Sequence, residues 1–109
     1  MSSKVPREVF AALERARPHL LDLLAGHGVR RIEFVAGFVE PYSVSVWLGT
    51  ETDAERDVLP VDHPFREAVR QVLDSAGLPH GQAQFNGTVA QSQETVDREY
   101  EGSWFYALR

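Results

Sequence analysis

The sequence predicts one α+β domain over residues 1–109, a two-layer sandwich in which an antiparallel sheet of three to five strands packs on two long helices. Two segments, Pro6–Ala25 and His63–Ala76, repeat apolar residues at spacings of three and four, as amphipathic helices do. Two others, Arg31–Val39 and Tyr42–Gly49, alternate apolar and polar residues with the period of strands. The length suits a single core. The expected element order is α-β-β-α-β-(α)-β.

The first helix is expected over about Pro6–Ala25. Ser3 is a candidate N-cap, and Pro6 suits a first turn because its missing N–H has no partner there. Pro18 removes a backbone donor inside the helix, so we expect one kinked helix, since the apolar stripe continues past it. The segment Gly26–Gly28 is expected to end it.

The two strands that follow are predicted to form an antiparallel hairpin. Arg31–Val39 and Tyr42–Gly49 are separated by a link too short for a crossover. Their apolar residues alternate in step, so both strands bury the same face of the sheet.

The second long helix has the clearest pattern in the chain. The segment Thr50–Asp62 before it is polar and acidic, and is expected to be a loop with at most one helical turn. Asp62 is the expected N-cap of the helix over His63–Ala76. Gly77 and the proline that follows shortly after it are typical of a helix end.

The last thirty residues allow more than one reading. Asn86-Gly87 suits a type I′ turn, so Gln82–Ala90 is either a tight hairpin or one irregular strand. Ser92 is expected to cap a short helix that reaches Tyr100. Ser103–Leu108 is rich in aromatic residues, which predicts a terminal strand that pairs within the sheet.

Charge and composition narrow the function classes. The chain has 11 basic and 16 acidic residues, a formal net charge of −5, which disfavours binding to nucleic acid. The basic excess lies in residues 1–31 and the acidic excess in residues 32–109. Absence of cysteine excludes disulfides and thiolate metal sites. No signal peptide or membrane span is indicated, so we expect a cytoplasmic protein without a membrane partner.

Motifs for catalysis or cofactors are not found. The histidines lack metal-ligand spacing, so neither a metal nor a cofactor is expected; they are His19, His27, His63 and His80. Neither a G-x-S-x-G elbow nor a glycine-rich phosphate loop occurs. We therefore predict no catalytic residues, and a binding protein is favoured over an enzyme.

A basic pair on the second helix is the local sign of nucleic-acid binding. Arg66 and Arg70 are i, i+4 neighbours there. We favour their reading as the solvated side of an amphipathic helix, because the acidic remainder of the chain opposes contact with phosphates.

Aromatic and acidic residues near the C-terminus, with two aromatics of the second strand, are the candidate binding residues. Aromatic residues beside charge commonly anchor partner surfaces. The alternative is that the aromatics pack together in the core and the acids are merely solvated. The candidates are Tyr42, Trp47, Glu94, Asp97, Glu99, Glu101, Trp104 and Tyr106.

Three functional hypotheses follow. The leading one is a non-enzymatic protein-binding or regulatory module, such as an immunity-like inhibitor, that attracts a basic partner through its acidic surface. The alternative is a small-ligand-binding protein or minor enzyme with an aromatic-lined pocket on the sheet. The third is self-association through a strand edge or sheet face.

Overall fold

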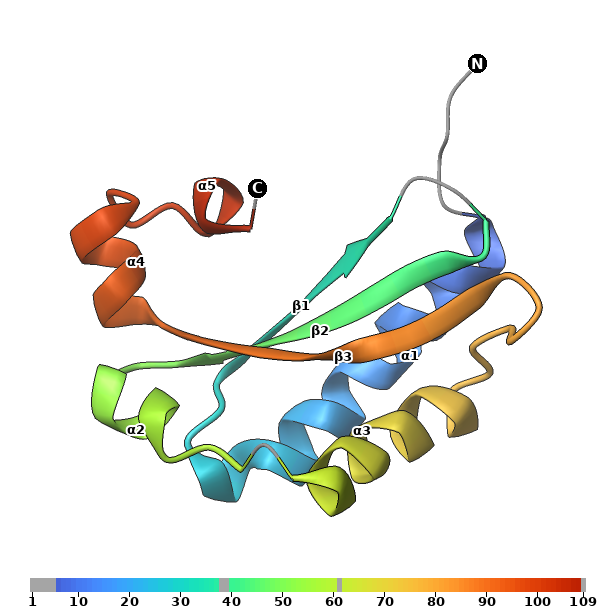
Figure 1. Cartoon of the computed structure of the whole chain (residues 1–109), viewed down its shortest axis with the longest axis horizontal. Coiled ribbons are helices and arrows are strands. Elements are labelled where there is room, and N and C mark those ends of the chain that lie inside the picture. Colours follow the sequence, from blue (N-terminus) through green and yellow to red (C-terminus); the bar gives the residue numbers. More distant parts are fainter. Residues whose placement is uncertain (1–5, 38–39, 61, 109) are drawn as a thin grey trace.

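The computed structural model describes residues 6–37, 40–60 and 62–108. The helices are α1 (Arg7–Leu24), the 3₁₀ turn η1 (Ala25–His27), α2 (Asp53–Asp57), α3 (His63–Ser75), α4 (Gln93–Glu99) and α5 (Trp104–Ala107). The strands are β1 (Arg31–Ala36), β2 (Tyr42–Thr50) and β3 (Ala83–Ser92). The α+β class is confirmed (Figure 1).

The described strands form a mixed sheet in the order β1-β2-β3. The predicted hairpin is confirmed, because β1 runs antiparallel to β2 with Ile32 opposite Leu48. The expectation of an entirely antiparallel sheet is wrong, since β3 lies parallel to β2. The reason is the crossover: α2 and α3 carry the chain back along the sheet, so β3 starts at the same end as β2.

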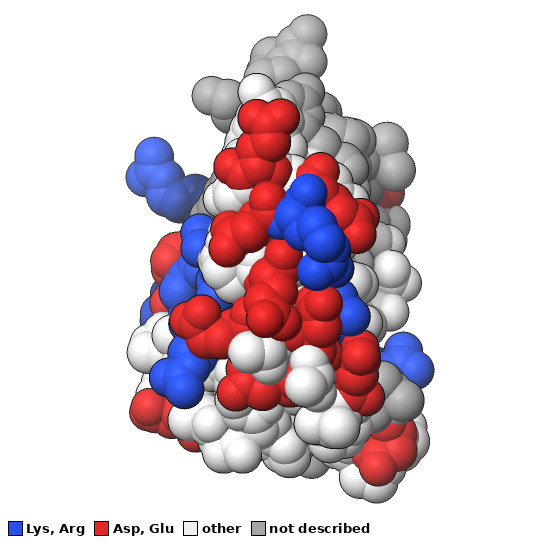
Figure 2. Space-filling model, turned by 90° about the vertical axis from the view of Figure 1, so that its left-hand side faces the viewer, with Lys and Arg blue, Asp and Glu red and all other residues white. Residues whose placement is uncertain are grey.

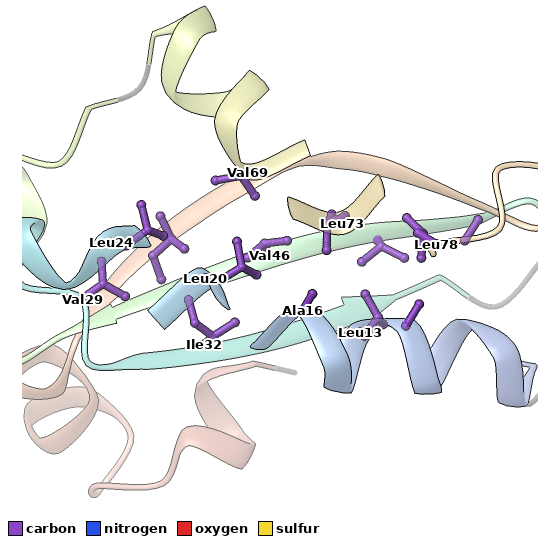
Figure 3. Packing of buried hydrophobic residues seen from close by; sticks show 14 of the residues in the cluster. Leu13, Ala16, Leu20, Leu24, Val29, Ile32, Val46, Val69, Leu73 and Leu78 are labelled. Carbon is purple, nitrogen blue, oxygen red and sulfur yellow. The ribbon is translucent and has the colours of Figure 1, made fainter. Parts of the chain in front are cut away.

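One face of the sheet is covered by the two long helices, and the core lies between these layers. Figure 1 shows α1 and α3 side by side beneath the strands, and Figure 3 shows the buried side chains between these elements, among them Leu20, Val46 and Val69. Leucines and valines from both helices meet alternate residues of β1 and β2, as the sequence periods predict. Side chains buried almost completely include Val9, Leu20, Leu24, Ile32, Val44, Val46, Leu48, Val69 and Leu73.

The long N-terminal helix runs without interruption through Pro18. Pro18 is exposed, so the carbonyl group that lacks a donor one turn earlier lies on the side open to water. Pro6 precedes the first helical residue, and the candidate cap Ser3 lies outside the described residues. Gly28, with φ of 83°, ends the short 3₁₀ turn that follows the helix.

Two predicted helix starts are found where the sequence places them, and a short helix forms where a loop with at most one turn was expected. The Asp62 carboxylate accepts a hydrogen bond from the Phe65 N–H at 3.0 Å, and α3 follows it. Ser92 caps α4 in the same way. The acidic segment after β2 contains the five-residue helix α2, whose first turn is closed by a capping box between Thr52 and Glu55.

In the C-terminal third, one of the two open readings is confirmed and another expectation fails. Residues 82–90 follow the reading of one irregular strand rather than a hairpin, because β3 runs continuously from Ala83 to Ser92, with a bulge at Asn86 and a φ of 139° at Gly87. The predicted terminal strand Ser103–Leu108 is instead the short helix α5. Positive φ angles at Glu101 and Gly102 turn the chain back over the sheet before that segment begins, so it does not lie along a strand edge.

Candidate functional site

Two acidic segments that are distant in the sequence meet at one end of the molecule. Parallel pairing aligns Thr50 of β2 with Ser92 of β3, so α2 and α4 begin side by side. The Asp53 N–H donates to Glu94 Oε1 at 2.7 Å, and the Glu94 N–H donates to the Glu51 carbonyl oxygen at 3.1 Å. We call residues 51–57 and 94–101 together the acidic end; it lies on the left of Figure 1.

The acidic end holds the whole negative excess of the chain. It contains eight acidic and two basic residues, while the rest of the chain contains eight acidic and nine basic ones. Figure 2 shows acidic side chains crowded over this side of the molecule. The acidic residues are Glu51, Asp53, Glu55, Asp57, Glu94, Asp97, Glu99 and Glu101.

A hydrogen-bonded network around Asp53 holds this end together. The hydroxyl groups of Ser92 and Thr95 both donate to Asp53 Oδ1, the second at 2.8 Å. Arg98 Nη1 donates to Asp53 Oδ2 at 3.2 Å. Arg56 Nη1 lies 3.4 Å from Asp53 Oδ1 and donates to Thr95 Oγ1 at 2.8 Å. The network thus links α2, the end of β3 and α4.

These contacts favour the ionised form of Asp53. The hydroxyl group of Ser92 has the largest effect, followed by that of Thr95 and then the charges of Arg98 and Arg56, and together they lower the pKa of Asp53 to about 2. A carboxylate with so low a pKa is a weak proton acceptor at neutral pH. Its role in this geometry is therefore to position neighbouring elements.

Most of the other acidic side chains project into solvent. The two arginines of the acidic end, Arg56 and Arg98, both contact Asp53. Arg56 also contacts Asp57, and Arg98 lies 3.8 Å from Glu99. The exposed acids are Glu51, Asp57, Glu94, Asp97, Glu99 and Glu101. Four of the sequence candidates are among them, and the structure adds the carboxylates before and within α2.

The aromatic candidates near the C-terminus have two different environments. Trp104 is only 7% exposed, donates from Nε1 to Gln93 Oε1 at 2.8 Å and lies under the Arg31 guanidinium, so it anchors α5. Tyr106 is 61% exposed, and Phe105 is 66% exposed with its ring 5.6 Å from that of Tyr106. The prediction missed Phe105, because alternation in a strand would have placed it on the face opposite to Tyr106, whereas consecutive residues of a helix point only about 100° apart.

The aromatic candidates of β2 lie on opposite faces of the sheet. Tyr42 packs against the main core beside the helices. Trp47 is half-buried on the other face, in a row with Glu33 of β1 and Val89 of β3. The structure therefore separates these two residues, and it does not place Tyr42 with the acidic end.

Three recesses have volumes of about 520, 380 and 370 Å³. The largest lies between α1 and α3, the second between α1 and β1, and the third between α3 and the start of β3. Their walls are formed by residues other than the aromatic candidates. The aromatic-lined ligand pocket thus remains an untested prediction without support from these recesses.

Two arginines of the basic N-terminal part bind the protein's own backbone. Arg15 donates from Nε and Nη2 to the carbonyl oxygen of Ala76, at the end of α3. Arg17 Nη1 donates to the carbonyl oxygen of Ile32 in β1. These charges stabilise the packing of α1, which gives them a role that needs no polyanion.

Other functional signs are sparse within residues 6–37, 40–60 and 62–108. No group of three or more acidic or histidine side chains in these ranges is arranged to hold a metal ion. No helix in these ranges is both long and apolar enough to cross a membrane. Comparison with family models, curated proteins and solved structures finds no match to this chain.

Proposed function

We propose that this protein is a non-enzymatic binding module whose acidic end engages a positively charged surface of another protein. The observation that carries the proposal is the concentration of the chain's net negative charge on two adjoining segments. Opposite charge on a partner accelerates encounter and fixes orientation. The rest of the molecule has nearly balanced charge and offers no comparable attraction.

Two further features support a protein as the partner. The network around Asp53 ties α2 and α4 to the sheet, so the exposed carboxylates are held in one arrangement before binding. The exposed rings of Phe105 and Tyr106 lie on α5, which is anchored to α4 by the bond from Trp104 to Gln93. Large flat side chains at a charged border are typical anchors of protein interfaces.

The acidic end is best suited to inhibit a partner by covering the partner's basic functional surface. An enzyme that acts on a polyanion has a basic substrate surface, and a fixed array of carboxylates competes for such a surface. We therefore propose an immunity-like or inhibitory action on a basic partner.

The test uses charge-neutralised variants of the whole chain. The variant Asp97→Asn/Glu99→Gln/Glu101→Gln removes three charges from the acidic end. The control Glu8→Gln/Asp22→Asn/Glu40→Gln removes the same number elsewhere. A basic protein captured from source cells should be retained by the wild type and the control, and lost from the acidic-end variant. With that partner purified, the association rate constant should fall by about tenfold or more between low and physiological salt.

Equal retention of the captured protein by all three chains would contradict the proposal. An association rate that does not change with salt would do the same, because steering between opposite charges is screened by ions. Circular dichroism of each variant verifies that it is folded.

A further inference from the structure

Arg66 and Arg70 lie along the outer edge of β3. Both belong to the side of α3 that faces this edge, one helical turn apart. The Arg70 guanidinium lies 5.5 Å from the ring centre of Phe85, and Arg66 Nη2 would be 3.3 Å from a Cβ built on Gly87. The next turn of the same stripe holds Asp74, which is paired with His80 at 3.3 Å.

The two arginines are only lightly neutralised. Arg70 Nε lies 3.4 Å from Glu67 Oε1, a contact between exposed side chains. Arg66 has no ion pair with any residue that the structure describes. Beside this edge the protein therefore presents positive charge, in contrast to its acidic end.

The hydrogen bonds between β2 and β3 determine which backbone groups of β3 point away from the sheet. The Tyr42 N–H donates to the Gln82 carbonyl oxygen at 2.8 Å, so the even-numbered residues of β2 bond to β3. In a parallel ladder each such residue bonds to the neighbours of its partner. Phe85 pairs with Val44 and Thr88 with Val46, so the N–H and C=O groups of Phe85 and Thr88 point outward.

The opposite edge of the sheet is occupied at one position. On β1 the side chain of Arg17 occupies the outward carbonyl oxygen of Ile32. No described residue makes an equivalent contact with the backbone of Phe85 or Thr88. An unpaired edge of this kind is a template for another strand.

We propose that the β3 edge between Phe85 and Thr88 binds an extended, acidic segment of another protein as a fourth strand. The backbone of the segment bonds to the outward groups of these two residues. Its acidic side chains on the helix side meet Arg66 and Arg70. At the start of the edge lies a recess of about 370 Å³ whose lining is mostly polar or charged and includes Arg70.

A second copy of this chain is not expected to pair with the β3 edge. Two β3 edges paired about a two-fold axis would place Arg66 and Arg70 of one copy against the same residues of the other, and like charges across a strand pair are destabilising. The proposal is independent of the proposed function, because Phe85 lies near the start of β3, whereas α4 follows its last residue.

The test is a titration of the full ¹⁵N-labelled chain, followed by NMR, with two heptapeptides. One alternates valine and glutamate and the other alternates valine and lysine, so they share strand propensity and differ in charge. The glutamate peptide should bind more tightly and should slow amide hydrogen exchange at Phe85 and Thr88. The variant Arg66→Glu/Arg70→Glu should weaken its binding by about tenfold or more and favour the lysine peptide. The control variant is Arg7→Glu/Arg30→Glu.

Equal binding of the two peptides would overturn the proposal, as would slower exchange at Phe34 and Ala36 of β1 in place of the β3 amides. Oligothymidylate that binds the wild type more tightly than the glutamate peptide would assign the arginines to nucleic acid and reject a strand partner. A variant that fails to fold is recognised from its spectrum, and the comparison of the two peptides on the wild type still decides the outcome.

Discussion

At the scale of single residues, Asp53 gains its role from partners that are remote in the sequence. Ser92 and Thr95 supply hydroxyl donors from the end of β3 and from α4, and Arg98 adds a charge from α4. Of the residues that contact Asp53, only Arg56 is close to it in the sequence. In the sequence alone, residues 51–57 therefore resemble an ordinary solvated loop. Their contacts are created by the pairing of β3 with β2.

The variant Asp53→Asn is expected to lower the free energy of unfolding at pH 7. The folded-state pKa of Asp53 is about 2, below the ordinary value of 3.8, so the carboxylate stabilises the folded state above about pH 4. This stabilisation decreases as the pH falls toward 2. Urea denaturation of both proteins should therefore show a difference in unfolding free energy that is constant near neutral pH and shrinks from about pH 4 to about pH 2.

Asp57→Asn is the matched control on the same helix, since its exposed carboxylate contacts only Arg56 among the ion pairs described. It should have a smaller effect than Asp53→Asn. A difference between wild type and Asp53→Asn that stays the same from pH 7 to pH 2 would show that the ionised form of Asp53 does not stabilise the fold.

At the scale of elements, α5 shows why aromatic density alone does not specify a strand. The Ser103 hydroxyl accepts a hydrogen bond from the Tyr106 N–H and starts a helical turn. Trp104 then packs over Gly49 of β2, where the lack of a side chain leaves room for the indole ring. The burial of one tryptophan on the sheet face thus determines where this segment lies.

Gly49→Ala should displace α5. A Cβ at this position would be 2.9 Å from the Arg31 Cβ and 3.0 Å from Trp104 Cη2, so the neighbours must move. We expect a loss of about 1–3 kcal/mol in unfolding free energy, as for other overpacked sites. Tryptophan fluorescence should shift to longer wavelength as the ring enters water.

Gly81→Ala is the control for this change, because no atom lies within 4 Å of the added Cβ. Its unfolding free energy should stay within about 0.5 kcal/mol of the wild type. Wild-type stability and fluorescence in Gly49→Ala would mean that α5 does not pack over β2.

At the scale of the whole molecule, negative charge is concentrated at one end of the sheet. The acidic end collects eight acidic residues, and both of its arginines are used within the network around Asp53. Elsewhere, Arg15 and Arg17 bind backbone carbonyl groups, Arg31 pairs with Glu33, and Arg66 and Arg70 lie along β3. Outside the acidic end the chain has eight acidic and nine basic residues, so its net negative charge belongs to one surface.

The crowded carboxylates should make stability depend on salt. Between about 0.01 M and about 0.1 M salt the screening length falls from about 30 Å to about 10 Å, which weakens repulsion within the acidic end. We therefore expect the melting temperature to rise over this range. Glu99→Gln/Glu101→Gln should rise less than the wild type, whereas Asp22→Asn/Glu40→Gln should follow it. Identical salt dependence in all three proteins would show that repulsion at the acidic end does not limit stability.

Part of the candidate site was predictable. The acids of α4 and the exposed Tyr106 were singled out by composition near the C-terminus. The burial of Trp104 was one of the two readings that the sequence allowed. The contribution of residues 51–57 and the exposure of Phe105 were not predicted, because they depend on contacts between distant segments. Tyr42 was grouped with Trp47 although the two lie on opposite faces of the sheet.

The sequence by itself determined both long helices, the β1–β2 hairpin and the caps at Asp62 and Ser92. Such features depend on side-chain periodicity and on hydrogen bonds to residues a few positions away. Only the tertiary structure decided that β3 runs parallel to β2, that the terminal aromatic segment is a helix, and that α2 lies beside α4. These outcomes depend on which apolar surfaces can be buried together, and that balance involves the whole chain at once.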